Sequence, residues 1–471
     1  MNGPLSAALT PLPDVAAWQW IPGTSGGSLL VAGRQRDTRR AAPGTVPVDE
    51  VIAVGDASVA GRDLTALPRL TRLLDEVALL AMARTLDRAR LFRQGREHDA
   101  THVVEALGTA PRHAWIVRRW LTTLTAEKRL AHDTATGRYR DLMAPDRAEY
   151  ARARRTLREA CQGLGYPPSM TRFFLAAADR LPALLRDETG LQGVLFPGGE
   201  TDTAEGNYRD NIPSRWANHA AAALIADEAR ARGGPRPLRI LEVGAGVGGT
   251  TGPVLDALAN TGTDYLFTDV SRFFLGSAQA AFADQPGLRF ALFDINAAPV
   301  GQGLAAGSRD VILAANVLHN ARHIGCALAG LRELLEPSGL LVLIESCREH
   351  YQALTSMYLL MSPAADEERW FTDLRAGQDR VFLTAEEWAD QLDAAGFDPL
   401  PALPGDGHPL AAAGQRVLAG RVRPGSGRPA PARVSAALAA RLPTAHRPAR
   451  VHAVDRLIPS SAATIEIGAF R

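Results

Sequence analysis

Short apolar runs alternate with amphipathic stretches in the second half of the chain, from about residue 237 onward. The runs are apolar enough to be buried on both faces, and stretches with helical spacing lie between most of them. Strands that alternate with helical crossovers predict a parallel sheet covered by helices, with ligands at the carboxyl ends of the strands. The expected strands are residues 238–243, 265–269, 288–294, 310–317 and 339–345, with helices around residues 250–260, 273–283 and 324–335.

The preceding half of the chain has a helical pattern that begins at about residue 67. Leu70, Leu74 and Val77 recur at three- and four-residue spacing, which predicts an amphipathic helix. Three helices followed by a hairpin predict a winged-helix-like unit, and helical segments continue over residues 147–230. The further elements expected in this unit are helices at residues 100–107 and 113–124 and a hairpin at residues 129–133 and 137–140.

The pattern divides the chain into five regions. In residues 1–62, Pro and Gly separate short apolar pieces such as 28–32 and 51–54, which either pair as a small β-structure or remain loosely docked. The other regions are a winged-helix-like helical domain (63–145), a helical lid or connector (146–230), a Rossmann-like domain (231–425) and a tail (426–471).

Composition and charge exclude several classes of protein. With 471 residues the chain exceeds the size at which one hydrophobic core usually stops growing, so two or three domains are expected. Its 52 basic and 51 acidic residues give a net charge of +1, which offers no field for nucleic acid or an anionic membrane. Three widely spaced cysteines indicate neither a disulfide framework nor a metal cluster.

No targeting or membrane segment is evident. The N-terminus lacks a charged region followed by a long apolar core, and no segment reaches about 18 uninterrupted apolar residues. A soluble protein in a reducing cytoplasm is therefore expected. Arg118, Arg119 and Lys128 in the winged-helix-like unit invite a DNA-binding interpretation, but the neighbouring tryptophans favour a packing module or a homodimer contact.

A glycine-rich turn follows the first expected strand of the sheet. The strand carries Glu242 near its end, and the chain then breaks into glycines before a helix. Glycines let a backbone approach a ligand where a Cβ would collide, so the turn is typical of nucleotide-binding sites. A tight strand-to-helix connection without a ligand is the alternative. The glycines are Gly244, Gly246, Gly248 and Gly249.

Polar residues also end the other expected strands. Asp269 lies about one βαβ repeat after the turn, where a carboxylate can accept two hydrogen bonds from a ribose diol. Asp294 is placed to take an exocyclic amine, with Ile295 beside an adenine ring. A single aspartate at a strand end is more often a helix cap, but five polar strand ends together indicate a ligand site. The fourth and fifth strands end at residues 316–319 and at Glu345.

These motifs resemble those of class I S-adenosylmethionine-dependent methyltransferases. The resembling motifs are Glu242-Val243-Gly244-Ala245-Gly246, Asp269, Asp294-Ile295 and Asn316-Val317-Leu318-His319. Further motifs resemble the methyltransferase domains of polyketide and non-ribosomal peptide synthetases, particularly the thiazoline siderophore type of yersiniabactin and pyochelin assembly. These are Phe196-Pro197-Gly198-Gly199, Tyr208-Arg209-Asp210-Asn211, Thr268-Asp269-Val270-Ser271 and Trp370-Phe371-Thr372-Asp373-Leu374-Arg375.

The resemblance covers residues 67–422 and implies a fold and a cofactor. The implied fold is a Rossmann-like seven-stranded α/β sheet with an N-terminal helical, winged-helix-like lid domain, and the implied cofactor is S-adenosylmethionine. The residues expected to bind it are Tyr208, Asn211, Glu242, Gly244, Gly246, Asp269, Asp294, Ile295 and Asn316. No metal is expected.

Methylation of carbon requires a base, because the acidified Cα–H of an acyl thioester or thiazoline must lose its proton. His319 follows the fourth strand and is placed for this role, and Glu345 on the adjacent strand can fix its tautomer. The resembling His and Glu of polyketide C-methyltransferases form such a dyad. The alternative for His319 is a ring hydrogen-bonded at a strand end.

Two further segments carry weaker expectations. Arg209 is expected to approach either the carboxylate of the methyl donor or a carrier phosphopantetheine. Residues 348–383 are either a substrate-covering insertion or simple core.

The tail is similar to the last segment of an adenylation domain, over residues 442–448, 451–457 and 459–466. Thr464 or Ile465 stands where that family has its adenylating lysine, so adenylation is not expected.

The function expected from the sequence is C-methylation, in trans, of a thiazolinyl or acyl thioester bound to an acyl or peptidyl carrier protein during antibiotic or siderophore biosynthesis. The enzyme alternatives are N-methylation of a thiazolidine or an amine and O-methylation of a free small molecule. The alternative outside catalysis is a scaffold whose methyltransferase fold has lost the donor.

Overall fold

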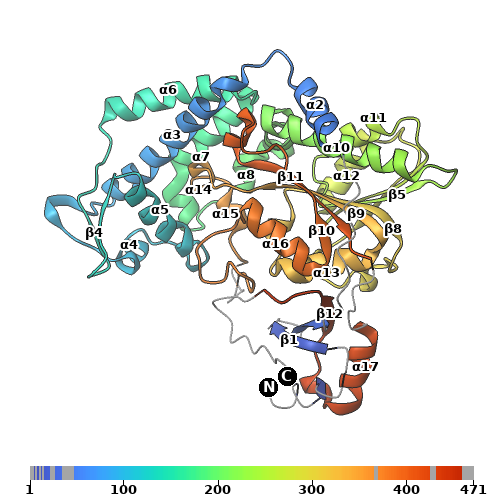
Figure 1. The fold of residues 1–471 in the computed structure, drawn as a ribbon. Helices are drawn as coiled ribbons and strands as arrows, with labels where there is room; N and C mark the ends of the chain where they lie inside the picture. The colour runs from blue at the N-terminus through green and yellow to red at the C-terminus, as the bar shows by residue number, and fades with distance from the viewer. Residues whose placement is uncertain are drawn as a thin grey trace.

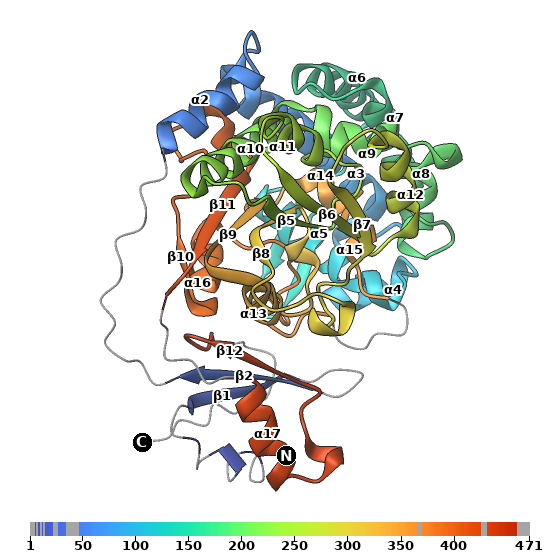
Figure 2. The same cartoon turned by 90° about the vertical axis from the view of Figure 1, so that its right-hand side faces the viewer.

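The computed structural model describes residues 47–364, 370–424 and 431–458 continuously. Before residue 47 it describes residues 15–21 and 27–33 and four single positions, Leu5, Ala8, Leu9 and Leu12. These residues form a large α/β body with a small sheet beneath it (Figures 1 and 2).

A seven-stranded sheet forms the centre of the large body, in the order β10-β11-β9-β8-β5-β6-β7. Strands β9, β8, β5, β6 and β7 run parallel, whereas β11 is antiparallel to both of its neighbours. The Rossmann-like fold class expected from the sequence is confirmed. The strands are β5 (Leu238–Val243), β6 (Thr263–Asp269), β7 (Leu288–Leu292), β8 (Arg309–Ala315), β9 (Leu335–Ser346), β10 (Phe397–Pro399) and β11 (Gln415–Val422).

Helices cover both faces of this sheet because successive side chains of each strand point to opposite faces. Ile240 and Val311 join the cluster that contains α10, whereas Leu241 and Ile312 join the cluster that contains α13 and α16. Burial on both faces explains why β5 and β8 have no polar alternation, whereas the edge strand β7 is only partly buried, contrary to the burial on both faces expected for it. The helices of this domain are α10 (Ile212–Arg232), α11 (Thr251–Ala257), α12 (Arg272–Ala281), α13 (Ile324–Leu334) and α16 (Ala385–Ala395).

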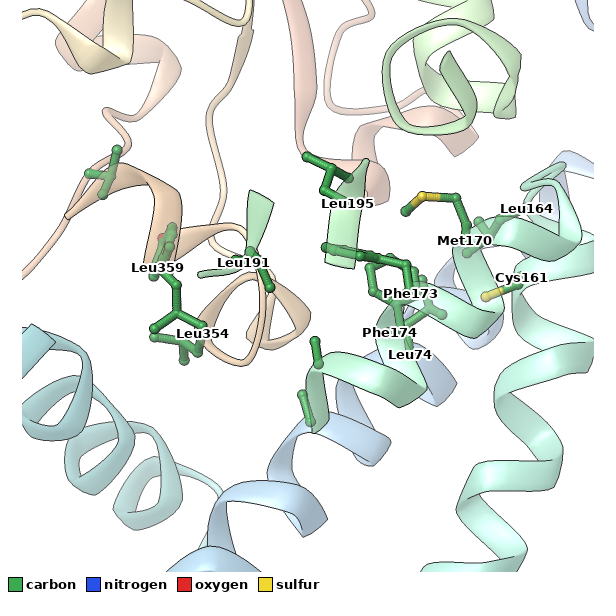
Figure 3. Packing of buried hydrophobic residues seen from close by; sticks show 14 of the residues in the cluster. Leu74, Cys161, Leu164, Met170, Phe173, Phe174, Leu191, Leu195, Leu354 and Leu359 are labelled. Carbon is green, nitrogen blue, oxygen red and sulfur yellow. The ribbon is translucent and has the colours of Figure 1, made fainter. Parts of the chain in front are cut away.

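The N-terminal helical region has the three helices and the hairpin that the sequence predicts. They are α3 (Leu67–Arg88), α4 (Ala100–Ala106), α5 (Ala114–Ala126), β3 (Ala131–Asp133) and β4 (Arg138–Arg140), followed by α6 (Arg147–Gly163) and α7 (Pro168–Leu185). Figure 3 shows Leu74 of α3 and Phe173 and Phe174 of α7 among the apolar side chains that join these helices. Leu354 and Leu359 belong to the same cluster, so the helical region and the 348–383 insertion share one core.

Helix α5 packs against this insertion. Trp120 Nε1 donates a hydrogen bond to the Leu354 carbonyl at 2.9 Å. Arg118 pairs with Asp379 and Arg119 with Glu349, so both guanidinium groups are engaged within the chain. These contacts show α5 as a packing element, and the homodimer contact through this region stays a prediction.

Residues 51–54, considered as a β-piece from the sequence, lie in the helix α2 (Val48–Ser58). This helix packs on α10, where Trp216 Nε1 donates to Asp56 Oδ1 at 2.8 Å. A Cβ on Gly55 would lie 2.6 Å from the Trp216 ring, so glycine permits this close approach. Helix α2, within the region expected over residues 1–62, therefore packs on the large body.

The small sheet combines the two ends of the described chain. Strand β2 (Ser28–Gly33) lies between β1 (Val15–Ile21), to which it is antiparallel, and β12 (Arg450–Val454), to which it is parallel. Leu438 of α17 (Pro431–Arg441) packs on Leu29 and Val31 from β2. Residues 1–62 and 426–471, expected from the sequence as separate regions, thus both contribute strands to one sheet. Residues 459–466 of the adenylation-like segment lie outside the described residues.

The other face of the small sheet contacts the large body. Leu30 and Val454 pack against Ala329 of α13, and Figure 2 shows β12 between β2 and α13. Across all the residues that the structure describes, no helix is long and apolar enough to cross a membrane.

The shared sheet predicts that a change at one end of the chain exposes the other. In Leu438→Asp, a carboxylate replaces a side chain in the core of the small sheet, which is strongly unfavourable for an unpaired charge. We expect limited proteolysis with mass spectrometry to show faster cleavage within both 15–33 and 431–458, while the 47–424 region resists. Ala439→Asp, at an exposed position of the same helix, is the control. Unchanged protection of residues 15–33 in Leu438→Asp would contradict the shared sheet.

Candidate functional site

Two adjoining cavities lie at the carboxyl ends of the parallel strands. The larger has a volume of about 390 Å³ and the smaller about 170 Å³. Tyr208, Asn316 and Met357 line both, so the cavities meet at these side chains. The larger volume falls in the range of roughly 300–1,000 Å³ that is usual for small-molecule sites.

The glycine turn after β5 forms one wall of the larger cavity. Gly244 has φ +62°, and a Cβ there would lie 2.4 Å from Val317 Cγ2. Gly246 has φ +55° and also lines the cavity, where a Cβ would meet only the Gly244 oxygen, at 3.9 Å. Gly244 therefore allows the turn to pack on Val317, and Gly246 leaves the cavity wall without a side chain.

Asp269 lies beside this turn at the end of β6. Its Oδ2 accepts a hydrogen bond from the Gly246 N–H at 3.0 Å, and its Oδ1 accepts from the Ser271 N–H at 2.8 Å. Burial raises the pKa of Asp269, although these backbone donors oppose the shift. The carboxylate lines the cavity and retains lone pairs for further donors.

Asp294 and Ile295 follow β7 and line the same cavity. Apolar side chains form much of the remaining wall, while Asp269, Asp294 and Asn316 supply polar atoms at separate places. This combination fits a flat apolar ring that carries polar edges together with a polyhydroxyl group. The apolar wall includes Leu195, Phe196, Val243, Val270, Phe274, Phe293 and Leu360.

Glu242 is not among the residues that line the two cavities. Its Oε2 accepts hydrogen bonds from Thr251 Oγ1 and from the Tyr265 hydroxyl, both at 2.7 Å. Burial raises the pKa of Glu242 to about 7. The carboxyl group thus joins β5, β6 and the start of α11 and supports the turn, and the cofactor contact expected for Glu242 stays a prediction.

His319 and Glu345 lie together beside the smaller cavity. His319 belongs to a 3-10 turn after β8, and its Nδ1 is 2.7 Å from Glu345 Oε2 on β9. The other carboxylate oxygen, Oε1, accepts from the Leu318 N–H at 2.8 Å. Asn320 Nδ2 is 3.2 Å from His319 Nε2. This network assigns the proton to Nδ1 and leaves a lone pair on Nε2, the arrangement of a general base.

Asn316 stands between the two cavities in a left-handed backbone conformation, with φ +56°. Its N–H donates to the Ile344 carbonyl at 2.6 Å, and its Oδ1 accepts from Gln415 Nε2 at 3.4 Å. A non-glycine residue in this region is strained, and such strain is concentrated at functional sites.

The segment 195–211 covers the glycine turn. It begins at the end of α8 (Gln192–Leu195) and contains α9 (Asp202–Glu205) and a π-helical turn (Gly206–Asp210) that carries Tyr208. A Cβ on Gly249 would lie 2.8 Å from the carbonyl oxygen of Tyr208. The backbone of the 195–211 segment, the lid, is therefore in close contact with the glycine turn. Burial raises the pKa of the Tyr208 hydroxyl.

Asn211 holds this lid in place. Its Nδ2 donates to the Gly206 and Asn207 carbonyls, and its Oδ1 accepts from the Ser214 N–H at the start of α10. It lines the smaller cavity and not the larger one. The Arg209 guanidinium pairs with Glu205 and Asp210. Its expected approach to the carboxylate of the methyl donor or to a phosphopantetheine stays a prediction.

The smaller cavity lies between the helical region and the 348–383 insertion. Leu74, Tyr166 and Phe174 come from the first, and Met357 and Met361 from the second. The insertion, which includes α14 (Tyr351–Leu354) and α15 (Tyr358–Met361), therefore contributes to the site as well as to the core.

Sequence reasoning missed several residues around His319. Asn320 directly follows His319 in the sequence, and this position could have identified it. Phe382, whose ring centroid lies 5.1 Å from that of His319, and Gln415 are distant in sequence and carry no local signal.

The chain is similar to known proteins that carry methyltransferase domains. Residues 241–341 match the family described as a methyltransferase domain. Pyochelin synthetase PchF of Pseudomonas aeruginosa is 31% identical over 396 residues, which are 82% of this chain and 21% of that protein. This chain thus spans about a fifth of the length of that relative.

Solved structures are similar over most of the chain. The CurJ carbon methyltransferase is 26% identical with a TM-score of 0.71, covering 80% of this chain and 99% of that one. The trans-methyltransferase CalH, solved in complex with SAH, is 23% identical with a TM-score of 0.55, covering 76% of this chain and 92% of that one. At 23% identity, the likeness to CalH concerns the fold alone.

The buried Glu242 predicts a pH dependence of stability. Its folded pKa of about 7 lies above the ordinary value of 4.5, so the folded state binds the extra proton and loses stability as pH rises between these values. Glu242→Gln should lack this loss. From about pH 5 to about pH 8, the free energy of unfolding of wild type should fall by roughly 2–3 kcal/mol relative to the variant. Urea denaturation across this range is the measurement, and parallel curves for both proteins would contradict the assignment.

Proposed function

The chain carries a methyltransferase domain of the S-adenosylmethionine-dependent class, related to those of non-ribosomal peptide and polyketide synthetases, and from this premise we propose that it methylates carbon. The proposed substrate is a thiazolinyl or acyl thioester held by an acyl or peptidyl carrier protein. The proposed setting is antibiotic or siderophore biosynthesis, with the chain acting in trans.

The single observation that carries the proposal is the pair of His319 and Glu345 beside the smaller cavity. An amine or a hydroxyl already has a lone pair with which to attack a methyl group. A C–H bond must first lose its proton, so a carbon nucleophile needs a positioned base. A buried histidine whose Nδ1 is held by a carboxylate meets that need.

The larger cavity fits the cofactor. Asp269 is the proposed partner of the ribose, Asp294 and Ile295 of the adenine, and the bare backbone at Gly246 of the amino-acid moiety. When bound there, S-adenosylmethionine supplies an electrophilic methyl group. Glu242 is assigned to the support of the turn, because its carboxyl is already bonded to Thr251 and Tyr265.

The chain's own residues then handle one proton. His319 Nε2 accepts the proton from the substrate Cα, and the hydrogen bond from Asn320 to this atom gives way as the substrate enters. The imidazolium that forms is stabilised by the Glu345 carboxylate, which the Leu318 N–H holds in place. Tyr208 and Asn316, at the junction of the cavities, orient the two reactants and exclude water.

The carrier-bound form of the substrate rests on the relatives. PchF is a synthetase, and this chain matches about a fifth of its length. A carrier protein would present its acyl group to the smaller cavity, whose walls combine apolar side chains with the dyad. The homodimer contact and the action of the chain in trans both stay predictions.

His319→Ala tests the proposal. Loss of the general base should lower the rate of methyl transfer about 10²–10⁴-fold. Affinity for S-adenosylmethionine should not change, because His319 does not line the larger cavity. The rate is measured by intact-mass analysis of a carrier protein bearing a β-ketoacyl or a thiazolinyl group, with a deuterated methyl donor, and the affinity by calorimetry.

His446→Ala, at an exposed histidine in the small-sheet region, is the matched control and should retain wild-type activity. Full turnover in His319→Ala would exclude the carbon-acid mechanism and leave N- or O-methylation. A wild-type protein that binds no donor in the calorimeter would favour the scaffold alternative.

A further inference from the structure

The sequence motif at residues 370–375 has no role in the mechanism described above, yet it lies directly behind the catalytic turn. We propose that Arg375 is a positioning residue for His319, clamping the backbone at the base and just after it, together with the wall against which its ring rests. This proposal rests on the proposed function, since it concerns the base of that reaction.

Arg375 is fully buried, and its guanidinium donates hydrogen bonds to three backbone carbonyls and to one carboxylate. Nη1 donates to the His319 carbonyl at 2.6 Å, and Nη2 donates to the Ala321 carbonyl at 2.7 Å. These carbonyls flank the end of the 3-10 turn that carries the base. A single side chain therefore fixes the path of the chain through the end of this turn.

The same guanidinium also holds the wall of the base. Nη1 donates to the Val381 carbonyl at 3.0 Å. The next residue is Phe382, whose ring packs edge to face on the His319 ring, with 5.1 Å between the two ring centroids. With Glu345 on Nδ1 and Phe382 against the ring, the imidazole has little rotational freedom, and Arg375 connects the backbones of both segments.

Two groups hold Arg375 itself. Asp373 accepts from Nε at 2.9 Å and from Nη2 at 2.6 Å, a bidentate pair that is almost completely buried. The Phe371 ring stacks on the guanidinium at 3.6 Å. Only arginine presents donors in such a planar fork, so lysine at this position can replace the charge but not the set of bonds.

The buried pair also sets the charge near the base. The charged and titratable groups around the base include Glu345 on β9, Asp373 and Arg375 in the insertion, His323 before α13, and Arg348 and His350, which line the smaller cavity with it. Burial opposes ionisation of Asp373, but Arg375 outweighs this and the net effect lowers its pKa. With both members present, the pair adds no net charge beside His319.

This arrangement predicts different effects on the two sides of the pair. In Arg375→Met the buried Asp373 loses the partner that keeps it ionised, so its carboxyl takes up a proton and the pair still adds no net charge beside the base. In Asp373→Asn the guanidinium remains, which favours the neutral imidazole and lowers the pH at which the base becomes neutral. Because the base must be neutral to act, the acidic limb of the kcat profile should keep its position in the first variant and move down in the second.

Geometry and charge are separated by Arg375→Lys. Lysine keeps a positive charge beside Asp373, so the acidic limb should stay at its wild-type position. It cannot, however, bridge the carbonyls of His319, Ala321 and Val381. We expect kcat to stay about 100-fold below wild type in both Arg375 variants, the effect of a misplaced reacting group. KM for S-adenosylmethionine should be unchanged, because Arg375 does not line the larger cavity.

The experiment measures pH profiles of methyl transfer with a β-ketoacyl carrier protein and S-adenosylmethionine. Arg93→Met, which removes an exposed ion pair with Asp87 in the helical region, is the control and should behave as wild type. Calorimetric donor binding and thermal denaturation identify variants that remain folded. If Arg375→Met does not fold, Arg375→Lys and Asp373→Asn still test the proposal.

Wild-type kcat in folded Arg375→Lys, together with a wild-type acidic limb in folded Asp373→Asn, would overturn it. These outcomes are distinct from a failure of the proposed function. If His319→Ala retains full turnover, there is no base to position and both proposals fall. If His319→Ala is inactive and the Arg375 and Asp373 variants behave as wild type, only the positioning role is excluded.

Discussion

The hydrogen bond between His319 Nδ1 and Glu345 Oε2, 2.7 Å long, requires two strands to end side by side. Strands β8 and β9 are adjacent and parallel, so the turn after one meets the last residues of the other. Burial of both strands by apolar side chains on each face keeps this register. The chemistry of the site thus depends on the packing of the sheet, and a shift of one strand would separate the base from its carboxylate.

Around that pair, the site divides its work between two cavities. The larger is bounded by the glycine turn and by carboxylates at strand ends, and the smaller by helical side chains and the 348–383 insertion. Asn316 and Tyr208 belong to both. The insertion contributes from two sides, since Met357 lines the cavities and Arg375 supports the catalytic turn from behind.

Local patterns predicted the parallel strands, and motifs at their ends predicted the dyad, because residues close in sequence determine where a buried strand stops. Contacts between distant segments had no such signal. The pairing of β12 with β2, the contact of Phe382 with His319 and the bonds of Arg375 to the turn all join residues far apart in the chain. A motif also cannot predict the partners of its own side chains. Glu242 accepts a hydrogen bond from Tyr265, and Arg209 pairs with Glu205, and neither contact could be read from the sequence.

The most direct test of the account asks whether His319 removes a proton from carbon. The protein is incubated in deuterated buffer with a β-ketoacyl carrier protein and without the methyl donor, and deuterium at Cα is followed by mass spectrometry. If His319 is the base, wild type should exchange this position faster than His319→Ala, which should match the rate without protein. Exchange no faster than in His319→Ala, from a wild-type protein that still methylates its substrate, would contradict the central claim.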